Sequence, residues 1–477
     1  MALRIPRSTL ISLLAITLVS CPKKHSTQPV NLSPEEVADR AKPATVLIFT
    51  EIEATAAVPD LSLDETTLEL ASQDELSPND STREKVRKVL NVLLSDPHRF
   101  FSQGTTMRTN KKKVYYTGSG FIFTPDGYIA TNAHVVEPED DDVKQALLES
   151  EVEWMKEDLA EVDDGISRLL PGSTMTDEAK ERLLKMLASY YEKTAGISDE
   201  KRTISAILGY TGSGSDPTLI RKECEVEKVG KQIPGKDVAI LKIKDDDKDL
   251  PTVSLAKTID SAGVRTGSEV DIVGFPGEVT VVKDLSFSSR LEASQTTGHV
   301  SSIRDMTDGW RVIQTDTAMN PGNSGGPALN SHADVVGLAT FQLKDGQGIN
   351  FVVSVDVLNE FLNALSITPS RGAYMETYLA ALDDLHSDHK ERALGRFEKL
   401  QRQHPGIRIV EDFVRNLRGE GVVAVSSPVE NTSSRRDAEG NTSQSPSRSS
   451  RPVLVFGGIA LLVMVLLVAV VAANRQS

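Results

Sequence analysis

The chain has 477 residues, of which 39% are hydrophobic and 25% are charged. This balance is typical of globular proteins, excludes a wholly disordered chain and a polytopic membrane protein, and favours two to three folded units. The formal charge of −15 argues against nucleic acid as a partner, since phosphate binding needs clustered lysine and arginine. The only cysteines, Cys21 and Cys224, are too few for a disulfide scaffold.

Residues 1–21 are predicted to form an export signal. Arg4 and Arg7 precede an apolar run from Leu10 to Ser20, which is too short to span a bilayer comfortably but has the length of a signal-peptide core. The run ends in the letters LVSC, which resemble the bacterial lipobox, where the cysteine is acylated and becomes the mature N-terminus. Two interpretations stay open: lipidation of Cys21, or an export signal in which this cysteine is incidental.

A β-hairpin is predicted in residues 114–136, which read VYYTGSGFIFTPDGYIATNAHVV. Two β-prone runs, 121–123 and 128–130, flank the turn tripeptide Pro125-Asp126-Gly127. His134 follows the second run and is expected at the end of a strand. A lone histidine is usually structural, so its meaning depends on partners elsewhere in the chain.

An acidic residue, Asp237, stands immediately before the predicted strand Val238–Ile243. An acid at the entrance of a buried strand is costly unless it is hydrogen-bonded, and a histidine ring N–H would satisfy it. Taken alone, Asp237 fits a solvated turn beside Lys236 equally well. Asp271, in the β-prone segment EVDIVGFPG, is the competing acid.

Residues 320–329 read NPGNSGGPAL and contain one serine, Ser324, between glycines. Such a loop can fold tightly and direct several backbone N–H groups at one point, which is what an oxyanion hole requires. The N–H groups of Gly322 and Ser324 are the candidate donors. A Ser/Gly linker is disfavoured because Pro321 and Pro327 bracket the loop and predicted strands flank it.

The candidate residues occur in the chain order His134, Asp237, Ser324. A serine hydroxyl is a weak nucleophile until a neighbouring imidazole takes its proton, and an acid orients that imidazole and stabilises its charged form. The three signals together therefore indicate nucleophilic catalysis by Ser324.

The segments TGSGFIFTPDGYIATNAHVV, GKDVAILKIK and IQTDTAMNPGNSGGPALN resemble the signature blocks of the HtrA (Deg) family of chymotrypsin-like (trypsin-like) serine proteases. The resemblance covers about residues 32–363. It implies a mostly β fold of two six-stranded antiparallel β-barrels, with the catalytic cleft between them. It also implies that His134, Asp237 and Ser324 are catalytic and that Gly322 and Ser324 supply the oxyanion hole. The family's usual C-terminal PDZ domain is not recognisable in the sequence.

The same resemblance suggests a substrate pocket. In chymotrypsin-like proteases the residue six positions before the serine lies at the base of the primary pocket, and here it is Ala318, followed by Met319. Neither side chain carries a charge, so a preference for small to medium aliphatic residues is expected. Asp316, eight positions before Ser324, is the alternative that would reach the pocket if the loop were rearranged.

The expected protease domain, residues 32–365, contains two insertions. The first, about 57–113, includes a helix-like stretch at Ser81–Leu94. The second, about 137–200, holds 19 acidic and 7 basic residues, and its apolar positions predict a helical hairpin. This hairpin is interpreted either as a regulatory or docking element beside the cleft or as a solvated loop. Residues 366–420 predict a small helical appendage.

Residues 453–473 contain no charge and, as a helix, would cover about 31 Å, which predicts a C-terminal transmembrane helix. The preceding residues 426–451 are too polar to form a core and predict a disordered tether. With the export signal, this organisation places the protease domain outside the cytoplasm, in the periplasm or at the cell surface.

The resulting hypothesis is a membrane-anchored, extracytoplasmic serine endopeptidase that cleaves unfolded or damaged proteins through an acyl-enzyme. Its expected partners are unfolded or partly folded proteins, the membrane through the C-terminal helix, and further copies of the chain in a homo-oligomer. No nucleic acid, metal or organic cofactor is indicated. The rival hypothesis is a tethered peptide-binding or chaperone module on a latent protease fold.

Overall fold

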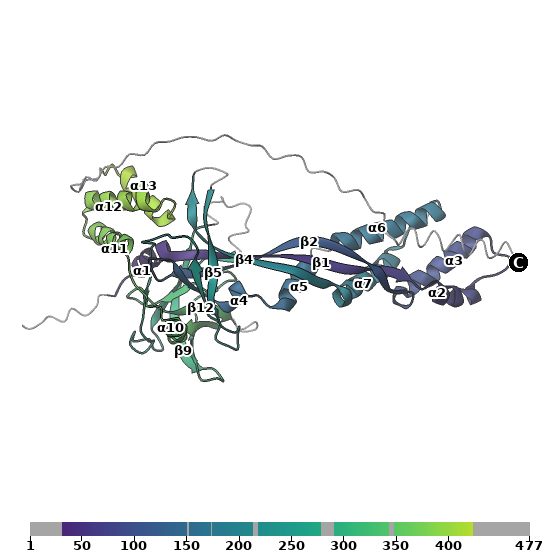
Figure 1. The fold of residues 1–477 in the computed structure, drawn as a ribbon, viewed down its shortest axis with the longest axis horizontal. Helices are drawn as coiled ribbons and strands as arrows, with labels where there is room; N and C mark the ends of the chain where they lie inside the picture. Colours follow the sequence, from purple (N-terminus) through teal and green to yellow (C-terminus); the bar gives the residue numbers. More distant parts are fainter. Residues whose placement is uncertain are drawn as a thin grey trace, which may run out of the picture.

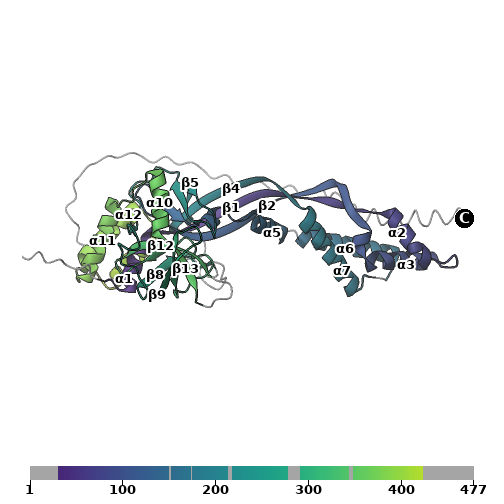
Figure 2. The ribbon, with the colours of Figure 1, turned by 90° about the horizontal axis from the view of Figure 1, so that it is seen from below.

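The computed structural model describes residues 31–149, 152–172, 174–212, 218–277, 291–342 and 348–422. The molecule is elongated, with a body of β-strands and C-terminal helices at one end and a long arm of strands that leads to a group of helices at the other (Figures 1 and 2). The candidate residues all belong to the body.

Six strands form a closed barrel in the order β1-β2-β3-β6-β5-β4. These strands are β1 (Thr45–Leu63), β2 (Phe101–Ile122), β3 (Tyr128–Thr131), β4 (Gly196–Thr211), β5 (Thr218–Val229) and β6 (Ala239–Ile243). The predicted hairpin joins β2 to β3, with Phe121 opposite Ala130 and with Gly127 at a φ of +94° in the turn. The mostly β class and one closed six-stranded barrel are therefore confirmed.

The other seven strands of the described residues form a second sheet in the order β11-β8-β9-β10-β13-β12-β7, with an additional pairing between β11 and β12. They are β7 (Ser254–Leu255), β8 (Glu269–Gly274), β9 (Ser294–Asp305), β10 (Arg311–Thr315), β11 (Pro327–Leu329), β12 (Asp334–Gln342) and β13 (Asn350–Ser354). One continuous apolar core extends from the barrel into this sheet. The two groups of strands are thus packed against each other.

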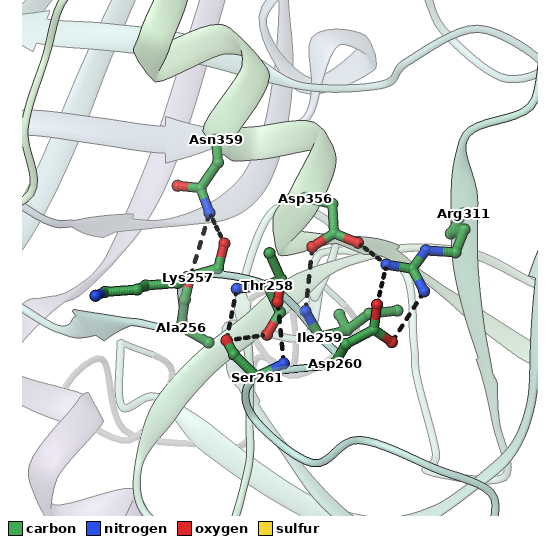
Figure 3. Close-up of polar contacts among 9 residues, drawn as sticks. All are labelled: Ala256, Lys257, Thr258, Ile259, Asp260, Ser261, Arg311, Asp356 and Asn359. Atoms are coloured by element: carbon green, nitrogen blue, oxygen red, sulfur yellow. Dashed lines mark hydrogen bonds and ion pairs between the residues drawn. The ribbon is translucent and has the colours of Figure 1, made fainter.

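Helix α10 (Val355–Leu365) fixes the segment that follows β7 (Figure 3). Asn359 Nδ2 donates to the carbonyl oxygens of Ala256 and Lys257, at 3.2 and 2.8 Å. Asp356 accepts from the backbone N of Ile259 at 3.1 Å and from Arg311 at 2.6 Å. These bonds join the start of the second sheet to the helix that follows its last strand.

The arm is built from the outer parts of β1, β2 and β4, with β1 in the middle. Its helices are α2 (Glu65–Ser72), α3 (Thr82–Ser95), α5 (Asp140–Glu149), α6 (Val152–Leu169) and α7 (Asp177–Thr194). Alternate residues of β1, among them Ile52, Ala54 and Val58, are buried against α5, α6 and α7. At the start of α3, Ser81 and Glu84 form a capping box, in the segment that predicts a helix.

The arm contains strands where the sequence suggested an insertion with one helix-like stretch. Much of the expected insertion at 57–113 continues β1 and β2 as barrel strands, with Thr55 still paired to Lys111 and Leu63 to Phe101. In the described part of the second insertion, α5 and α6 lie where its first helix is expected. Helix α5 packs on the barrel end of the arm through Val143, whereas α6 packs on α7.

Three C-terminal helices pack together beside the barrel, with Tyr378 and Phe397 in their core. They are α11 (Ala373–His386), α12 (Lys390–Gln403) and α13 (Arg408–Gly419). The Tyr378 hydroxyl donates to the carbonyl oxygen of Asp39 in α1 (Pro34–Ala41) at 2.6 Å, which ties these helices to the start of the described chain. Within the described ranges, no His, Cys, Asp and Glu residues cluster as a metal site would require.

Several predicted segments lie outside the described residues. They are the export signal at 1–21 with Cys21, the tether at 426–451 and the transmembrane helix at 453–473. In the part of the chain that the structure covers, every helix is too short or too polar to cross a bilayer.

Asp39 provides a test of how the C-terminal helices and the barrel pack. Its carboxyl lines a cavity of about 210 Å³ between α13 and the barrel, and burial raises its pKa from 3.8 to about 6, against the opposing charge of Lys42. A raised carboxyl pKa means that folding stability falls as pH rises from 3.8 through 6, because the folded state must give up a proton that it holds more tightly than the unfolded chain does.

Asp39→Asn is therefore expected to raise the midpoint of thermal unfolding at pH 8 and to change it little at pH 4. The gain should be about 1–2 kcal/mol, after a discount for the partial exposure of this carboxyl. Thermal unfolding followed by circular dichroism at both pH values measures it. Glu391→Gln, which neutralises an exposed carboxyl of α12 that does not line the cavity, is the control. An equal shift at both pH values would contradict the argument.

Candidate active site

His134 lies on the single-turn helix α4 (Ala133–Val136), just past the end of β3. The hydroxyl of Thr50 in β1 donates to the carbonyl oxygen of Val135 at 2.8 Å and anchors this turn. The Nδ1 atom of His134 lies 2.7 Å from Oδ2 of Asp237, and its backbone N donates to Oδ1 at 3.0 Å. The imidazole is therefore held by both oxygens of one carboxylate.

Asp237 is buried, with 1% of its surface exposed. Burial alone would raise its pKa, but the hydrogen bond and charge of His134, together with the hydroxyl of Thr340, outweigh burial and lower it. The carboxylate is then ionised at neutral pH and can only accept hydrogen bonds. It follows that Nδ1 of His134 carries the proton and that Nε2 is left as an acceptor.

The Ser324 loop has a backbone that requires glycine. Gly322 has a φ of +98°, and a Cβ there would lie 2.3 Å from the backbone N of Gly277. Gly325 has a φ of +85°, and a Cβ there would lie 2.1 Å from the carbonyl oxygen of Ser119. Side chains at either position would displace the loop, so the glycines flanking Ser324 are explained by steric necessity.

Ser119, at the inner end of β2, joins this loop to the barrel. Its backbone N donates to the carbonyl oxygen of Ser324 at 2.7 Å. Its hydroxyl donates to the carbonyl oxygen of Gly322 at 2.7 Å and accepts from the backbone N of Phe275 at 2.8 Å. The Ser324 loop, which precedes β11 of the second sheet, is thereby held against β2 of the barrel.

Thr340 in β12 connects the serine to the acid. The Ser324 hydroxyl donates to the carbonyl oxygen of Thr340 at 3.1 Å, and the Thr340 hydroxyl donates to Oδ2 of Asp237 at 2.7 Å. The structure therefore brings His134, Asp237 and Ser324 into one hydrogen-bonded arrangement, although the Ser324 hydroxyl is turned to Thr340 and not to the imidazole.

Residues 197–338 match the family described as trypsin-like peptidase domain. The serine protease Do-like HtrA of Bacillus subtilis is 32% identical over 173 residues, which are 34% of this chain and 35% of that protein. A probable periplasmic serine endoprotease, DegP-like, of Pseudomonas savastanoi is 29% identical over 261 residues, or 54% of this chain and 36% of that protein. The chain is a homologue of the HtrA serine proteases.

The resemblance stated from the sequence is thereby confirmed. The putative serine protease HhoA of Synechocystis is a further relative, 25% identical over 287 residues, or 60% of this chain and 52% of that protein. The chain spans about a third to a half of the length of these curated relatives. Among solved structures, the HtrA-type protease AlgW with a decapeptide has a TM-score of 0.35 at 18% identity, covering 70% of this chain and 68% of that one.

The residues expected to form the primary pocket of this HtrA homologue lie in different environments. Ala318 is exposed, and its carbonyl oxygen accepts from the Thr296 hydroxyl at 2.8 Å, whereas Met319 is buried in the main core. The carboxylate of Asp316 accepts from the backbone N of His299 at 2.6 Å. Asp316 is thus bound to the backbone of β9, as a structural residue would be.

Asp271, the competing acid, is fully buried in β8 and makes no bond to His134. Its Oδ1 accepts from Gln295 at 2.8 Å and from Thr297 at 2.5 Å.

Two further residues of the site, Ser119 and Thr340, are not among those predicted from the sequence. Ser119 stands within the quoted TGSG motif, which could have drawn attention to it, but Thr340 is one threonine in an apolar strand and has no local signal.

Proposed function

We propose that this chain is a serine endopeptidase of HtrA type in which Ser324 is the nucleophile, His134 the general base and Asp237 the residue that orients and stabilises the imidazolium. The observation that carries the proposal is the pair of hydrogen bonds between His134 and the buried, ionised carboxylate of Asp237, at 2.7 Å to Nδ1 and 3.0 Å to the backbone N. The hydrogen bond from Nδ1 leaves Nε2 as the acceptor for a serine proton. The chemistry is acyl transfer through a covalent acyl-enzyme.

In the first step the Ser324 oxygen attacks the carbonyl carbon of a peptide bond while Nε2 of His134 takes the hydroxyl proton. His134 then gives this proton to the leaving amine, and water repeats the sequence on the ester. The hydroxyl must first turn from the Thr340 carbonyl towards Nε2, which is a rotation about one Cα–Cβ bond. Catalytic hydrogen bonds are often incomplete before substrate binds.

The oxyanion is proposed to bind the backbone N–H groups of Gly322 and Ser324. In the described part of the structure neither N–H has a protein acceptor, while the Gly322 carbonyl is held on the other side by Ser119. The positive φ of Gly322 supports this orientation of the loop. Donors fixed in advance need no reorganisation when the negative charge develops.

The chain's wider organisation is part of the same proposal. Pairings run from β11 through β8, β9, β10, β13 and β12 and return through β12–β11, which supports a second six-stranded barrel. The periplasmic names of relatives and the export signal support a location outside the cytoplasm. The uncharged residues 453–473 support a membrane anchor. The proposed substrates are unfolded or partly folded proteins. The proposed assembly is a homo-oligomer.

One observation favours the rival function, a peptide-binding or chaperone module on a latent protease fold. The Ser324 hydroxyl bonds to a carbonyl and not to the imidazole, as in a resting serine. Labelling of the full chain with a fluorophosphonate probe separates the two functions, because only an activated serine reacts. Labelling that is lost in Ser324→Ala supports the endopeptidase, whereas no labelling, with or without peptide present, supports the latent module.

The primary pocket is expected to accept small to medium aliphatic residues. Ala318 and Met319 carry no charge, and the carboxylate of Asp316 is bound to β9, so no buried anion would select Lys or Arg there. Apolar pockets discriminate by about 1–3 kcal/mol per methylene, so the preference should be broad. Mass spectrometry of digested casein tests it. Cuts mostly after Lys and Arg would contradict this assignment even if Ser324 is the nucleophile.

A further inference from the structure

A cavity of about 330 Å³ adjoins the imidazole of His134. Its inner wall is formed by His134, Asp237 and Thr340, whereas Ser324 does not line it. Ala318 and Met319, the residues assigned to the primary pocket, do not line it either, so the cavity is a separate site that shares the imidazole. A substrate segment bound across Ser324 and His134 would bring a side chain next to the scissile bond to this cavity.

Another part of the cavity wall comes from the second insertion (about 137–200), which is rich in acidic residues and is called the acidic insertion below. Glu139 and Asp142, just before and within the first turn of α5, both line it and are exposed. Neither carboxylate has an ion pair with any residue in the described ranges. Arg202, which contacts the same segment through the carbonyl oxygen of Val136, is already paired with Glu200. The charge of this wall is thus not neutralised.

The cavity also has an apolar part. Tyr116 of β2 and Ile233, four residues before Asp237, both line it, and the Tyr116 ring packs against apolar side chains of α5. Lysine and arginine combine an apolar stem with a cationic end, so they match a cavity with apolar walls and acidic residues at its edge. Glutamate and aspartate would be repelled by the same wall.

We propose that this cavity is a specificity subsite that binds a lysine or arginine side chain of the substrate, on a residue adjoining the scissile bond. The inference rests on the proposed endopeptidase function. It assigns a role to the acidic insertion, since Glu139 and Asp142 recognise the basic side chain. The enzyme would then cut after an aliphatic residue where a basic residue stands beside it, which narrows the otherwise broad choice of sites in an unfolded protein.

Fluorogenic peptides with leucine in the primary position and lysine, norleucine or glutamate at each adjoining position test the proposal. At one adjoining position the full chain should show kcat/KM for lysine roughly tenfold above norleucine, as expected for two exposed ion pairs, and glutamate should be the poorest substrate. The preference should shrink in 0.5 M salt, where charges are screened over about 4 Å. Glu139→Gln/Asp142→Asn should reduce the lysine-to-norleucine ratio to near one.

The matched control is Asp140→Asn/Asp141→Asn, which removes the same charge from the same turn of α5 at residues that do not line the cavity. It should keep the ratio of the wild type. Equal ratios for lysine and norleucine in the wild type would overturn the proposal. An equal fall of the lysine-to-norleucine ratio in both variants would overturn it too, because the preference would then come from the overall negative charge of the insertion and not from the two residues that line the cavity.

A binding measurement separates this inference from the endopeptidase proposal. Fluorescence anisotropy with the uncleaved lysine and norleucine peptides, on Ser324→Ala with and without Glu139→Gln/Asp142→Asn, does not depend on cleavage. Tighter binding of the lysine peptide that the acidic substitutions abolish supports the subsite even if the wild type cleaves nothing. Cleavage of casein with no difference between the peptides in either assay rejects the subsite and leaves the endopeptidase standing.

Discussion

Ser324→Ala is expected to lower the turnover of casein by about 10⁶-fold while the fold stays intact. The variant lacks the attacking oxygen, so no acyl-enzyme can form. The loop should keep its place because Ser119 holds it through the carbonyl oxygens of Ser324 and Gly322, and neither bond uses the Ser324 side chain. Only the bond to the Thr340 carbonyl is lost, which is worth about 1 kcal/mol.

Initial rates of casein cleavage and thermal unfolding of the purified full chains measure both parts of this expectation. Ser301→Ala, which truncates an exposed serine on β9, is the matched control and should retain wild-type activity. Casein cleavage by Ser324→Ala above a few per cent of the wild-type rate would reject Ser324 as the nucleophile. A large loss of stability would show instead that the side chain supports the loop.

The parts of the site that could be predicted from sequence are those that require a particular backbone conformation over a few residues. The Ser324 loop is recognisable because positive φ and close backbone contacts force glycine at Gly322 and Gly325, which leaves a pattern in the letters themselves. The hairpin before His134 is recognisable for a similar reason, since Gly127 closes its turn. Such constraints act within a few residues.

The role of Thr340 could not be predicted, because it depends on a contact between distant segments. Thr340 reaches Asp237 across 103 residues of sequence, and nothing beside it marks that role. The choice of Asp237 over Asp271 rests on the family resemblance, because local pattern alone does not separate an acid before an apolar strand from an acid within one. Only the three-dimensional arrangement places the first beside His134 and the second between Gln295 and Thr297.

The arm escaped prediction because its strands lack the usual apolar signal. Where β1 and β2 pair beyond Ile52, two of the buried positions of β1 are alanines, Ala54 and Ala56, and β2 carries three successive lysines from Lys111 to Lys113. This composition is typical of an exposed edge strand that discourages further pairing. The pairing itself leaves no local pattern in the sequence, because the partner residues lie some fifty positions away.

Asp237→Asn is expected to lower the rate of casein cleavage by about 10⁴-fold, although the side chains are nearly the same shape. The carboxylate now accepts three bonds, from the backbone N of His134, from its Nδ1 and from the Thr340 hydroxyl. An amide has one acceptor oxygen. If its oxygen faces Nδ1, its NH₂ group is forced against the backbone N–H of His134. If its NH₂ faces Nδ1, the ring proton must move to Nε2, where it blocks proton transfer from Ser324.

Asp271→Asn is the decisive comparison for this variant. It makes the same chemical change in another fully buried carboxyl, which accepts from Gln295 and Thr297 and has no bond to His134. Its effect should fall on thermal stability, with kcat for casein within a few fold of the wild type, whereas Asp237→Asn should lose kcat. The reverse result, an inactive Asp271→Asn and an active Asp237→Asn, would show that the buried acid beside His134 only shapes the turn and that the imidazole is oriented from the second sheet.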